Sequence, residues 1–304
     1  MTLDRYILFL QNVDGIGDGT IRKLILNNCF KNFSPRTLEE MLAFLKQNKS
    51  CFTKKTVIDN LTLNDLKKAN ERCNLLENQC ASLGVKYISF FNECYPPKFK
   101  MMANMKSCDF PVILFYLGNI HLLNAQKMCS IIGTRKPSPN AKSLCAAIAK
   151  KMSEKGYVVI SGLAEGCDTI AHIGCIEADG KTIAIVGTGL DTTFPKSNKE
   201  LQERIIKTGG LVISEYPIGF KGATYSFVQR DRLQASLANI VIPIQTSLAG
   251  GTMHAAKACV EKYNNALIVV SPSLVSDGDS SGNNHLIKEY FAKPINNLSD
   301  IEKL

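Results

Sequence analysis

Short apolar runs without charged residues alternate with longer helical stretches in the second half of the chain. The runs are rich in β-branched residues and span 128–132, 157–160, 182–186, 211–213, 240–244 and 266–270. Runs of this kind are typical of strands that are buried on both faces of a sheet. Strands that alternate with helices form βαβ units with right-handed crossovers. The pattern predicts a Rossmann-like, mostly parallel α/β sheet with helices on both faces and a core over about 127–275.

The first part of the chain has a different pattern. Apolar residues recur at helical spacing around 21–25 and 38–45, and Thr62 can cap a helix that runs to Cys80. We therefore predict a small all-helical domain over 1–80, followed by the Rossmann-like domain over 81–304. Two further strands are expected early in this second domain, near 84–89 and 112–117.

Composition agrees with a folded protein and excludes several classes. Of the 304 residues, 45% are apolar and 21% are charged, which is usual for a globular chain. No apolar run is long enough to span a membrane, and the first residues, which include Asp4 and Gln11, do not form a secretory signal. We expect a cytoplasmic protein with no membrane partner.

Cysteines and histidines do not form a recognisable site. The eleven cysteines are odd in number, are spread along the chain and include no C-x-x-C pair, and there are only four histidines. Their spacing builds no zinc site. We therefore expect reduced thiols and no metal.

Small, turn-forming residues directly follow most of the predicted strands. In an open parallel sheet, the loops after the strands lie along one edge, where ligands bind. Glycine lets a ligand approach the backbone, and the helix that follows each loop offers unpaired N–H groups, so the preferred ligand is an anion such as phosphate. The glycines match neither a dinucleotide fingerprint nor a P-loop, and we expect no cofactor.

Arginines are few, and their positions are informative. The net charge is +9, yet only eight residues are Arg, and three of them, Arg135, Arg230 and Arg232, lie near the predicted strand ends. Arginine recognises phosphate with two donors, and Phe227 beside two of them can stack on a nucleobase. In the alternative interpretation, Phe227 belongs to the core and Arg230 pairs with Asp231 or Glu215.

These loops and side chains make up the predicted DNA- or phosphate-binding site. Its residues are Gly133, Thr134, Arg135, Lys136, Ser161, Gly162, Gly166, Gly187, Gly189, Phe227, Arg230, Arg232, Gly250, Gly251 and Thr252.

A second, weaker motif lies near the N-terminus. Residues 13–17, Val-Asp-Gly-Ile-Gly, are followed by Thr20, Arg22 and Lys23, as in a helix-hairpin-helix element that binds a DNA phosphate. A glycine-rich turn between two packed helices fits the same residues equally well.

The order of these motifs resembles the DNA-processing protein A family, called DprA or Smf, a branch of the Rossmann-like superfamily that includes the LOG proteins. The resemblance covers about 85–295 and rests on 131–137, 159–168, 187–191, 214–217, 227–232, 250–252 and 281–284. It implies a cytosolic homodimer that binds and protects single-stranded DNA and helps load a RecA-type recombinase in natural transformation and recombination. Arg135, Phe227, Arg230 and Arg232 would contact the strand, and no catalytic residue is implied. The helical front end agrees with the family's sterile-alpha-motif-like domain.

Some residues depart from the family pattern and keep another function open. Asp231 stands where the family usually has Asn, and we expect no C-terminal winged helix, because few residues follow the last motif. The alternative is a LOG-like nucleotide-processing enzyme or a nucleotide sensor. The Gly250-Gly251-Thr252 loop has no Glu until 261, although Glu165, Asp168, Asp191 and Glu215 lie on the same predicted edge.

Overall fold

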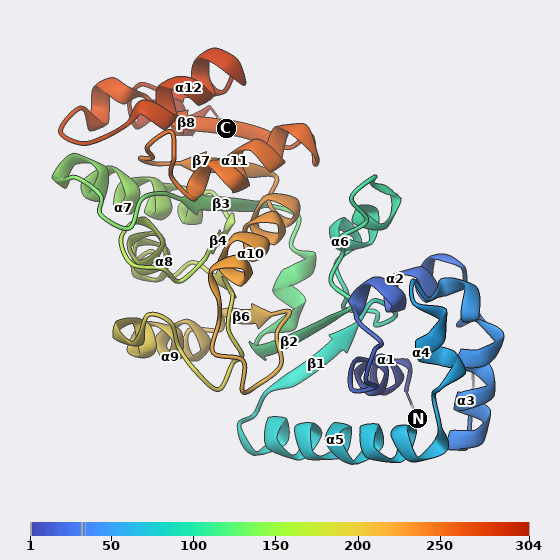
Figure 1. The fold of residues 1–304 in the computed structure, drawn as a ribbon. Coiled ribbons are helices and arrows are strands. Elements are labelled where there is room, and N and C mark those ends of the chain that lie inside the picture. Colours follow the sequence, from blue (N-terminus) through green and yellow to red (C-terminus); the bar gives the residue numbers. More distant parts are fainter. Residues whose placement is uncertain (1, 32, 34, 304) are drawn as a thin grey trace. The chain divides into compact units, whose positions relative to one another are not determined.

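The computed structural model describes residues 2–31, 33 and 35–303, which form two compact units, Met1–Phe115 and Tyr116–Leu304 (Figure 1). This division differs from the boundary predicted near residue 80. Residues after 80 pack with the first helices: the Asp4 carboxylate accepts hydrogen bonds from the Ser89 amide (2.8 Å) and from the Asn92 side chain (2.6 Å). Such pairings between distant segments cannot be inferred from a local pattern.

Helices dominate the first unit. Its helices are α1 (Leu3–Gln11), α2 (Asp18–Leu26), α3 (Leu38–Gln47), α4 (Lys55–Asp59), α5 (Leu63–Ser82) and α6 (Pro97–Met101), with short 3-10 turns at Lys49–Cys51 and Met102–Asn104. Strand β1 (Lys86–Ser89) follows α5, and β2 (Ile113–Gly118) crosses into the second unit. The predicted cap of α5 is present, because the Asp65 amide donates to Thr62 Oγ1 and the Thr62 amide donates to Asp65 Oδ2.

The glycine-rich turn near the N-terminus joins α1 to α2. Gly15 has a φ of +83°, and a Cβ at this position would lie 2.6 Å from the Val57 side chain. Arg22 Nε donates to the Phe110 carbonyl at 2.7 Å. The motif therefore serves packing inside the first unit, and a DNA contact of this turn stays a prediction.

Seven parallel strands build the second unit. They are β3 (Met128–Ile132), β4 (Val158–Ser161), β5 (Thr182–Val186), β6 (Leu211–Ser214), β7 (Ile240–Pro243), β8 (Ala266–Val270) and β9 (Lys293–Ile295). Their order in the sheet is β6-β5-β4-β3-β7-β8-β9. The six predicted runs are confirmed to within one residue at each end, and only the short β9 has no counterpart among them.

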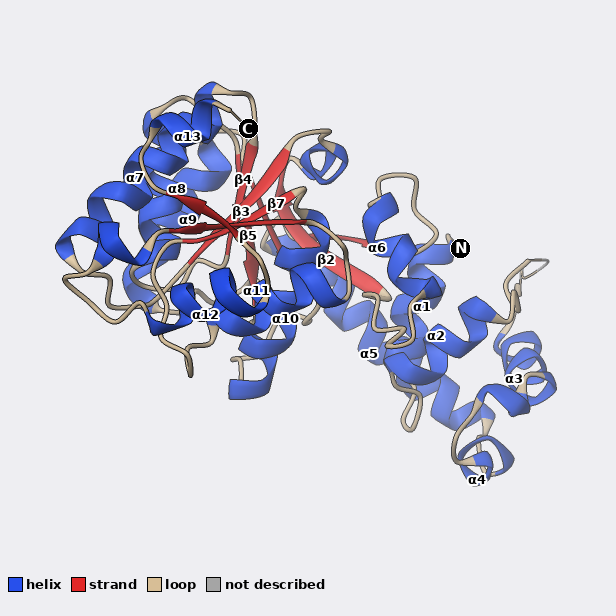
Figure 2. Cartoon of the chain, turned by 90° about the horizontal axis from the view of Figure 1, so that it is seen from above, coloured by secondary structure: helices blue, strands red, loops and turns tan. Residues whose placement is uncertain are grey.

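Helices cover both faces of this sheet, as the sequence predicts (Figures 1 and 2). α7 (Pro139–Glu154), α8 (Cys167–Glu177) and α9 (Lys199–Lys207) lie on one face, and α10 (Thr224–Leu237) and α11 (Thr252–Glu261) lie on the other. The chain continues through α12 (Ser281–Glu289) and α13 (Ser299–Glu302), with 3-10 turns at Ile120–Asn124, Lys196–Asn198 and Pro272–Val275. Among the described residues, no helix combines the length and the apolar character that a membrane span needs.

Proline in the fifth predicted run fits because of its place in the strand. Pro243 is the last residue of β7 and lies opposite Ile132 in the register with β3. The next amide, that of Ile244, donates to the Ile132 carbonyl at 2.9 Å. The missing N–H of a proline at a strand end therefore leaves the ladder between β3 and β7 intact.

Strands β3 and β7 are neighbours in the sheet although more than half of the second unit's residues lie between them in sequence. From β3 the chain winds outward to β6, and it then returns to β7 by way of the opposite face. The loops after β3 and β7 consequently leave the sheet toward opposite faces. This divergence opens a crevice at the carboxyl ends of the two strands, the usual ligand position in a doubly wound sheet.

Candidate nucleic-acid interface

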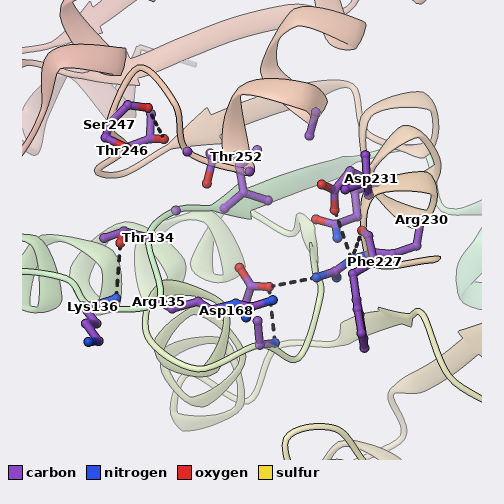
Figure 3. Close-up of a pocket in the computed structure, with 18 residues that line it drawn as sticks. Thr134, Arg135, Lys136, Asp168, Phe227, Arg230, Asp231, Thr246, Ser247 and Thr252 are labelled. Carbon is purple, nitrogen blue, oxygen red and sulfur yellow. Dashed lines mark hydrogen bonds and ion pairs between the residues drawn. The ribbon is translucent and has the colours of Figure 1, made fainter. Parts of the chain in front are cut away.

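A pocket of about 440 Å³, called the main pocket below, lies in this crevice of the second unit (Figure 3). The loop after β3, the N-terminus of α8, one side of α10 and the loop that leads into α11 form its walls. Its lining residues are Ile132, Gly133, Thr134, Arg135, Lys136, Ala164, Asp168, Phe227, Val228, Arg230, Asp231, Gln234, Thr246, Ser247, Gly250, Gly251, Thr252 and Ala255.

Close backbone packing fixes the loop after β3. A Cβ at Gly133 would lie 2.5 Å from the Cys167 sulfur, and a Cβ at Gly166 would lie 2.5 Å from the carbonyl oxygens of Thr134 and Arg135. The Thr134 amide donates to the Gln245 carbonyl at 2.8 Å, which joins this loop to the end of β7. The glycines therefore let two loops and a helix meet at one point of the pocket wall.

Arg135 is the residue that the hollows of this surface share. It lines the main pocket together with Lys136, and the side chains of both are exposed. It also lines a second hollow of about 110 Å³, beside Phe194 and Phe227, and a more open third depression of about 530 Å³ beside Lys136 and Lys142. Arg135 thus lies where three adjoining hollows meet.

Arg230, in contrast, is used inside the protein. It is only 7% exposed, and its Nη1 donates to the Ile185 carbonyl at 2.9 Å. Its Nη2 lies 3.7 Å from an Asp168 oxygen, and its Nε lies 3.0 Å from Asp231. A Cβ at Gly162 would lie 1.3 Å from Nη1, so this glycine makes room for the guanidinium. Arg230 therefore forms the floor of the pocket and holds two carboxylates, one of them in the pairing with Asp231 that the alternative interpretation anticipates.

Burial of these two carboxylates shifts their titration. Burial raises the pKa of Asp168, although Arg230 and the amides of Gly162 and Ala164 stabilise its charge. The pKa of Asp231 is raised to about 7, chiefly by burial and also by the Asp168 charge, while Arg230 and Arg135 act in the opposite direction. Asp231 is consequently poised to change its charge near neutral pH.

Arg232 lies outside the lining of these hollows. Its two terminal nitrogens each lie 2.6 Å from an oxygen of Glu215, and both side chains are largely buried. Two residues apart on a helix, Arg230 and Arg232 point in different directions. A bidentate ion pair of this kind occupies the donors that a DNA phosphate would need.

The loop after β7 brings a helix N-terminus to the pocket. A Cβ at Gly250 would lie 2.5 Å from Thr246 Oγ1, so the turn is tight, whereas a Cβ at Gly251 would meet no atom within 4 Å. The Thr246 amide donates to the buried Asn283 side chain at 2.8 Å, which holds the loop in place. The amides of Met253 and His254 donate to the Gly250 and Gly251 carbonyls, both at 3.0 Å, and this first turn of α11 carries the positive end of the helix dipole. This wall of the pocket favours an anion.

The structure gathers most of the predicted site residues around these hollows. Nine of them line the main pocket: Gly133, Thr134, Arg135, Lys136, Phe227, Arg230, Gly250, Gly251 and Thr252. Gly162 and Gly187 line the second hollow, and Gly166 lines the third.

The remaining predicted residues, Ser161, Gly189 and Arg232, line none of the three hollows. The Ser161 hydroxyl donates to the Ile131 carbonyl at 2.7 Å inside the sheet, and the Gly189 amide donates to the Phe220 carbonyl at 2.7 Å. Ser161 and Gly189 therefore hold the loop backbone in place without lining a hollow.

Sequence reasoning missed several lining residues, among them Gln234, Thr246 and Ser247. Helical spacing was the available signal for Gln234, because Phe227, Asp231 and Gln234 follow one face of α10 at steps of four and three residues.

The carboxylates considered for a nucleotide-processing enzyme are dispersed. Glu215 is paired with Arg232, and an Asp191 oxygen accepts a hydrogen bond from the Gly219 amide at 2.9 Å. Glu165 lies on the second hollow, and Asp168 is held by Arg230 and two amides. None of these four is placed in the main pocket with a free carboxylate, so enzymatic activity stays an untested alternative.

Comparison with known proteins identifies the family. Residues 86–304 match the model of the family described as DNA recombination-mediator protein A. The DNA processing protein DprA of Streptococcus pneumoniae is 35% identical over 201 residues, which are 66% of this chain and 68% of the relative. The alignments with the Smf proteins of Synechocystis and Escherichia coli cover only 37% and 51% of those longer chains.

Solved structures agree with this result. The crystal structure of DprA from Streptococcus pneumoniae is similar over the whole chain and 98% of its own length, with a TM-score of 0.78 and 26% identity. DNA processing protein A from Helicobacter pylori, whose structure is described as showing a single-stranded DNA binding mode, matches 72% of this chain and 95% of its own length, with a TM-score of 0.63 and 32% identity. The chain belongs to the DprA/Smf family of DNA recombination-mediator proteins.

Proposed function

We propose that this protein binds single-stranded DNA at the carboxyl ends of β3 and β7. The observation that carries the proposal is the position of Arg135, an exposed arginine at the junction of three adjoining hollows. Successive nucleotides of one strand would occupy successive hollows and pass over the same cation. The Helicobacter pylori relative, with its single-stranded DNA binding mode, supports this assignment.

Each wall of the main pocket has a part in binding. Arg135 and Lys136 contact phosphates, and Thr134, Thr252 and the positive end of the α11 dipole complete the anion site. The Phe227 ring offers a face on which a base stacks. Arg230 holds the two carboxylates of the pocket floor in place, while the glycines allow the strand to approach the backbone.

The shape of the pocket favours a single strand over a duplex. The Phe227 ring lines a concave pocket, so a base must leave its own stack to reach the ring. Bases in a duplex are paired and stacked inside the helix, and extracting one costs a few kcal/mol. A single strand offers its bases without this cost, and stacking on aromatic rings tolerates any sequence.

Binding of fluorescent oligonucleotides across a salt series tests the proposal. We expect preference for single strands over duplexes, an affinity that falls with salt, and a loss of affinity in Arg135→Ala together with a shallower salt slope, by about 0.7. Arg204→Ala removes the same charge from the exposed surface of α9 and is the matched control. Equal effects of the two substitutions would contradict a specific site and leave only diffuse attraction by the net charge of +9.

The family description supports a wider role. We propose that the protein acts in the cytoplasm as a homodimer without a catalytic step, protects incoming single strands and helps load a RecA-type recombinase on them during DNA uptake and recombination. Filament formation by a RecA-type recombinase on strands coated with single-strand-binding protein should be faster when this protein is added. An unchanged rate would contradict recombinase loading, and a monomer in light scattering would contradict the dimer.

A further inference from the structure

Phe194 is a large aromatic residue that the core does not use. Its side chain is 47% exposed and lies on the wall of the second hollow. Its ring packs against the ring of Phe227, with centroids 4.9 Å apart and planes at 34°. This separation is that of a direct ring pair, so no base fits between the two rings. The face of the Phe194 ring that is turned away from Phe227, called its outer face below, therefore continues the aromatic surface of Phe227 away from the main pocket.

Hydrogen bonds hold the two walls of the second hollow in place. The Asn198 side chain donates to the Leu163 carbonyl and to Thr169 Oγ1, both at 2.9 Å, and the Ser197 hydroxyl donates to Glu165. These contacts tie the segment that follows Phe194 to the loop after β4. The hollow is thus organised before any ligand binds, which lowers the entropic cost of binding.

Phe227, at the back of the hollow, is equally fixed. A Cβ at Gly187 would lie 2.9 Å from one edge of its ring, and a Cβ at Gly222 would lie 2.9 Å from its tip. Two backbone segments without side chains thus clamp the ring. Phe194 consequently packs on a rigid support, as an aromatic stacking platform needs.

The second hollow offers a hydrogen-bond acceptor beside an aromatic ring. Arg135, Arg230 and Glu165 are the charged residues that line it, and Arg135 also lines the main pocket. The Arg230 guanidinium is engaged by Ile185, Asp168 and Asp231, so Arg135 is the cation open to a phosphate and Glu165 is the charged acceptor open to a base. The exocyclic amino group of cytosine donates hydrogen bonds that glutamate accepts.

We propose that Phe194 and Glu165 form a second nucleobase subsite, which takes a base with an exocyclic amino group from the nucleotide next to the one in the main pocket. The base stacks on the outer face of Phe194, its amino group donates to Glu165, and Arg135 contacts the phosphate between the two nucleotides. This inference rests on the proposed single-strand binding. It adds a preference for certain bases to a site whose other contacts, to phosphates and to the face of a base, do not depend on the base sequence.

Affinities for oligo-dC and oligo-dT of about 20 nucleotides, longer than a typical single-strand site, test the subsite. We expect tighter binding of oligo-dC, and Glu165→Gln should abolish that preference. Phe194→Ala should weaken binding of both strands by about five-fold or more, the loss typical of one stacked base. Phe194→Tyr keeps the ring and should bind like the unmodified protein. Phe291→Ala is the control, because Phe291 is 89% exposed and precedes β9, away from the carboxyl ends of the strands.

The outcomes separate the subsite from the proposed function. If Arg135→Ala loses affinity while Phe194→Ala binds like the unmodified protein, the main site stands and the subsite is overturned. Equal affinity of the unmodified protein for the two strands, or a preference that survives in Glu165→Gln, also overturns the subsite. Failure of the unmodified protein to bind either strand overturns both proposals.

Discussion

Arg135 and Arg230 have different roles in the predicted site, because Arg135 is exposed and Arg230 is buried. Arg135 offers its guanidinium to solvent, whereas Arg230 compensates the charges of Asp168 and Asp231 in the pocket floor. Removing one partner from such a buried arrangement leaves carboxylates without a counter-charge. A loss of DNA binding therefore has a different physical cause in the two substitutions.

Arg230→Ala should lower the free energy of unfolding by about 3–5 kcal/mol, the usual effect of uncompensated buried charge. Arg135→Ala should leave stability nearly unchanged, because surface substitutions typically change it by less than about 0.5 kcal/mol. Urea unfolding of both variants checks this. Equal stabilities would show that Arg230 is not needed for the pocket floor and is available to DNA.

Asp231 makes the pocket sensitive to pH. Burial raises its pKa to about 7, with Arg230, Asp168 and Arg135 as the neighbouring charges. Below that pH the carboxyl is neutral and can donate a hydrogen bond to a phosphate; above it the negative charge repels the strand. Single-strand affinity should therefore rise as the pH falls through about 7. His172, held neutral because burial lowers its pKa to about 3, does not contribute in this range.

Asp231→Asn provides the control for this pH effect. The variant should bind more tightly than the unmodified protein at higher pH, and its affinity should depend less on pH. The folded-state pKa of Asp231 lies above its ordinary value of 3.8, so the contribution of this group to the free energy of unfolding falls as the pH rises from about 4 to about 7. Parallel pH profiles for the two proteins would exclude Asp231 as the titrating group.

At the scale of elements, Gly162 in the loop after β4 leaves the space that the Arg230 side chain of α10 occupies. Gly162→Ala would place a Cβ 1.3 Å from Arg230 Nη1, so the guanidinium would have to move away from Asp168. We expect a loss of about 1–3 kcal/mol in the free energy of unfolding, as for other overpacked sites. Gly251→Ala, where a Cβ meets nothing within 4 Å, should leave stability nearly unchanged. Similar unfolding midpoints for the two variants would contradict this account of the loop.

The strands were predictable because their signal is local. A parallel strand that is buried on both faces consists of consecutive apolar residues, as in β3 and β5. Strand β9 has only three residues, and with Lys293 and Pro294 it carries no such run. The position of the site followed from the same pattern, because loops after parallel strands share one edge.

Side-chain directions and distant partners were less predictable. The sequence places Arg230 and Arg232 close together, and helix geometry shows that they face different ways. Their partners, however, lie in other elements: Asp168 is in the first turn of α8, and Glu215 follows β6. Only the folded arrangement of the sheet brings them together, so the sequence alone did not show that both arginines are paired inside the protein.

At the scale of the whole molecule, the second unit carries the proposed site and most of the family match. The family model begins at residue 86, and the three hollows all lie within Tyr116–Leu304. The predicted boundary near 80 and the contact boundary after Phe115 differ because residues 81–115 pack against the first helices. The assignment of DNA binding to the second unit does not depend on which boundary is used.

Photochemical crosslinking of a single strand that contains 5-iododeoxyuridine, followed by peptide mapping, tests the central claim most directly. The account predicts crosslinks to peptides that contain Phe227, whose ring stacks on a base, and a loss of those crosslinks in Arg135→Ala. Crosslinks confined to Met1–Phe115, or unchanged in Arg135→Ala, would contradict the proposed position of the strand.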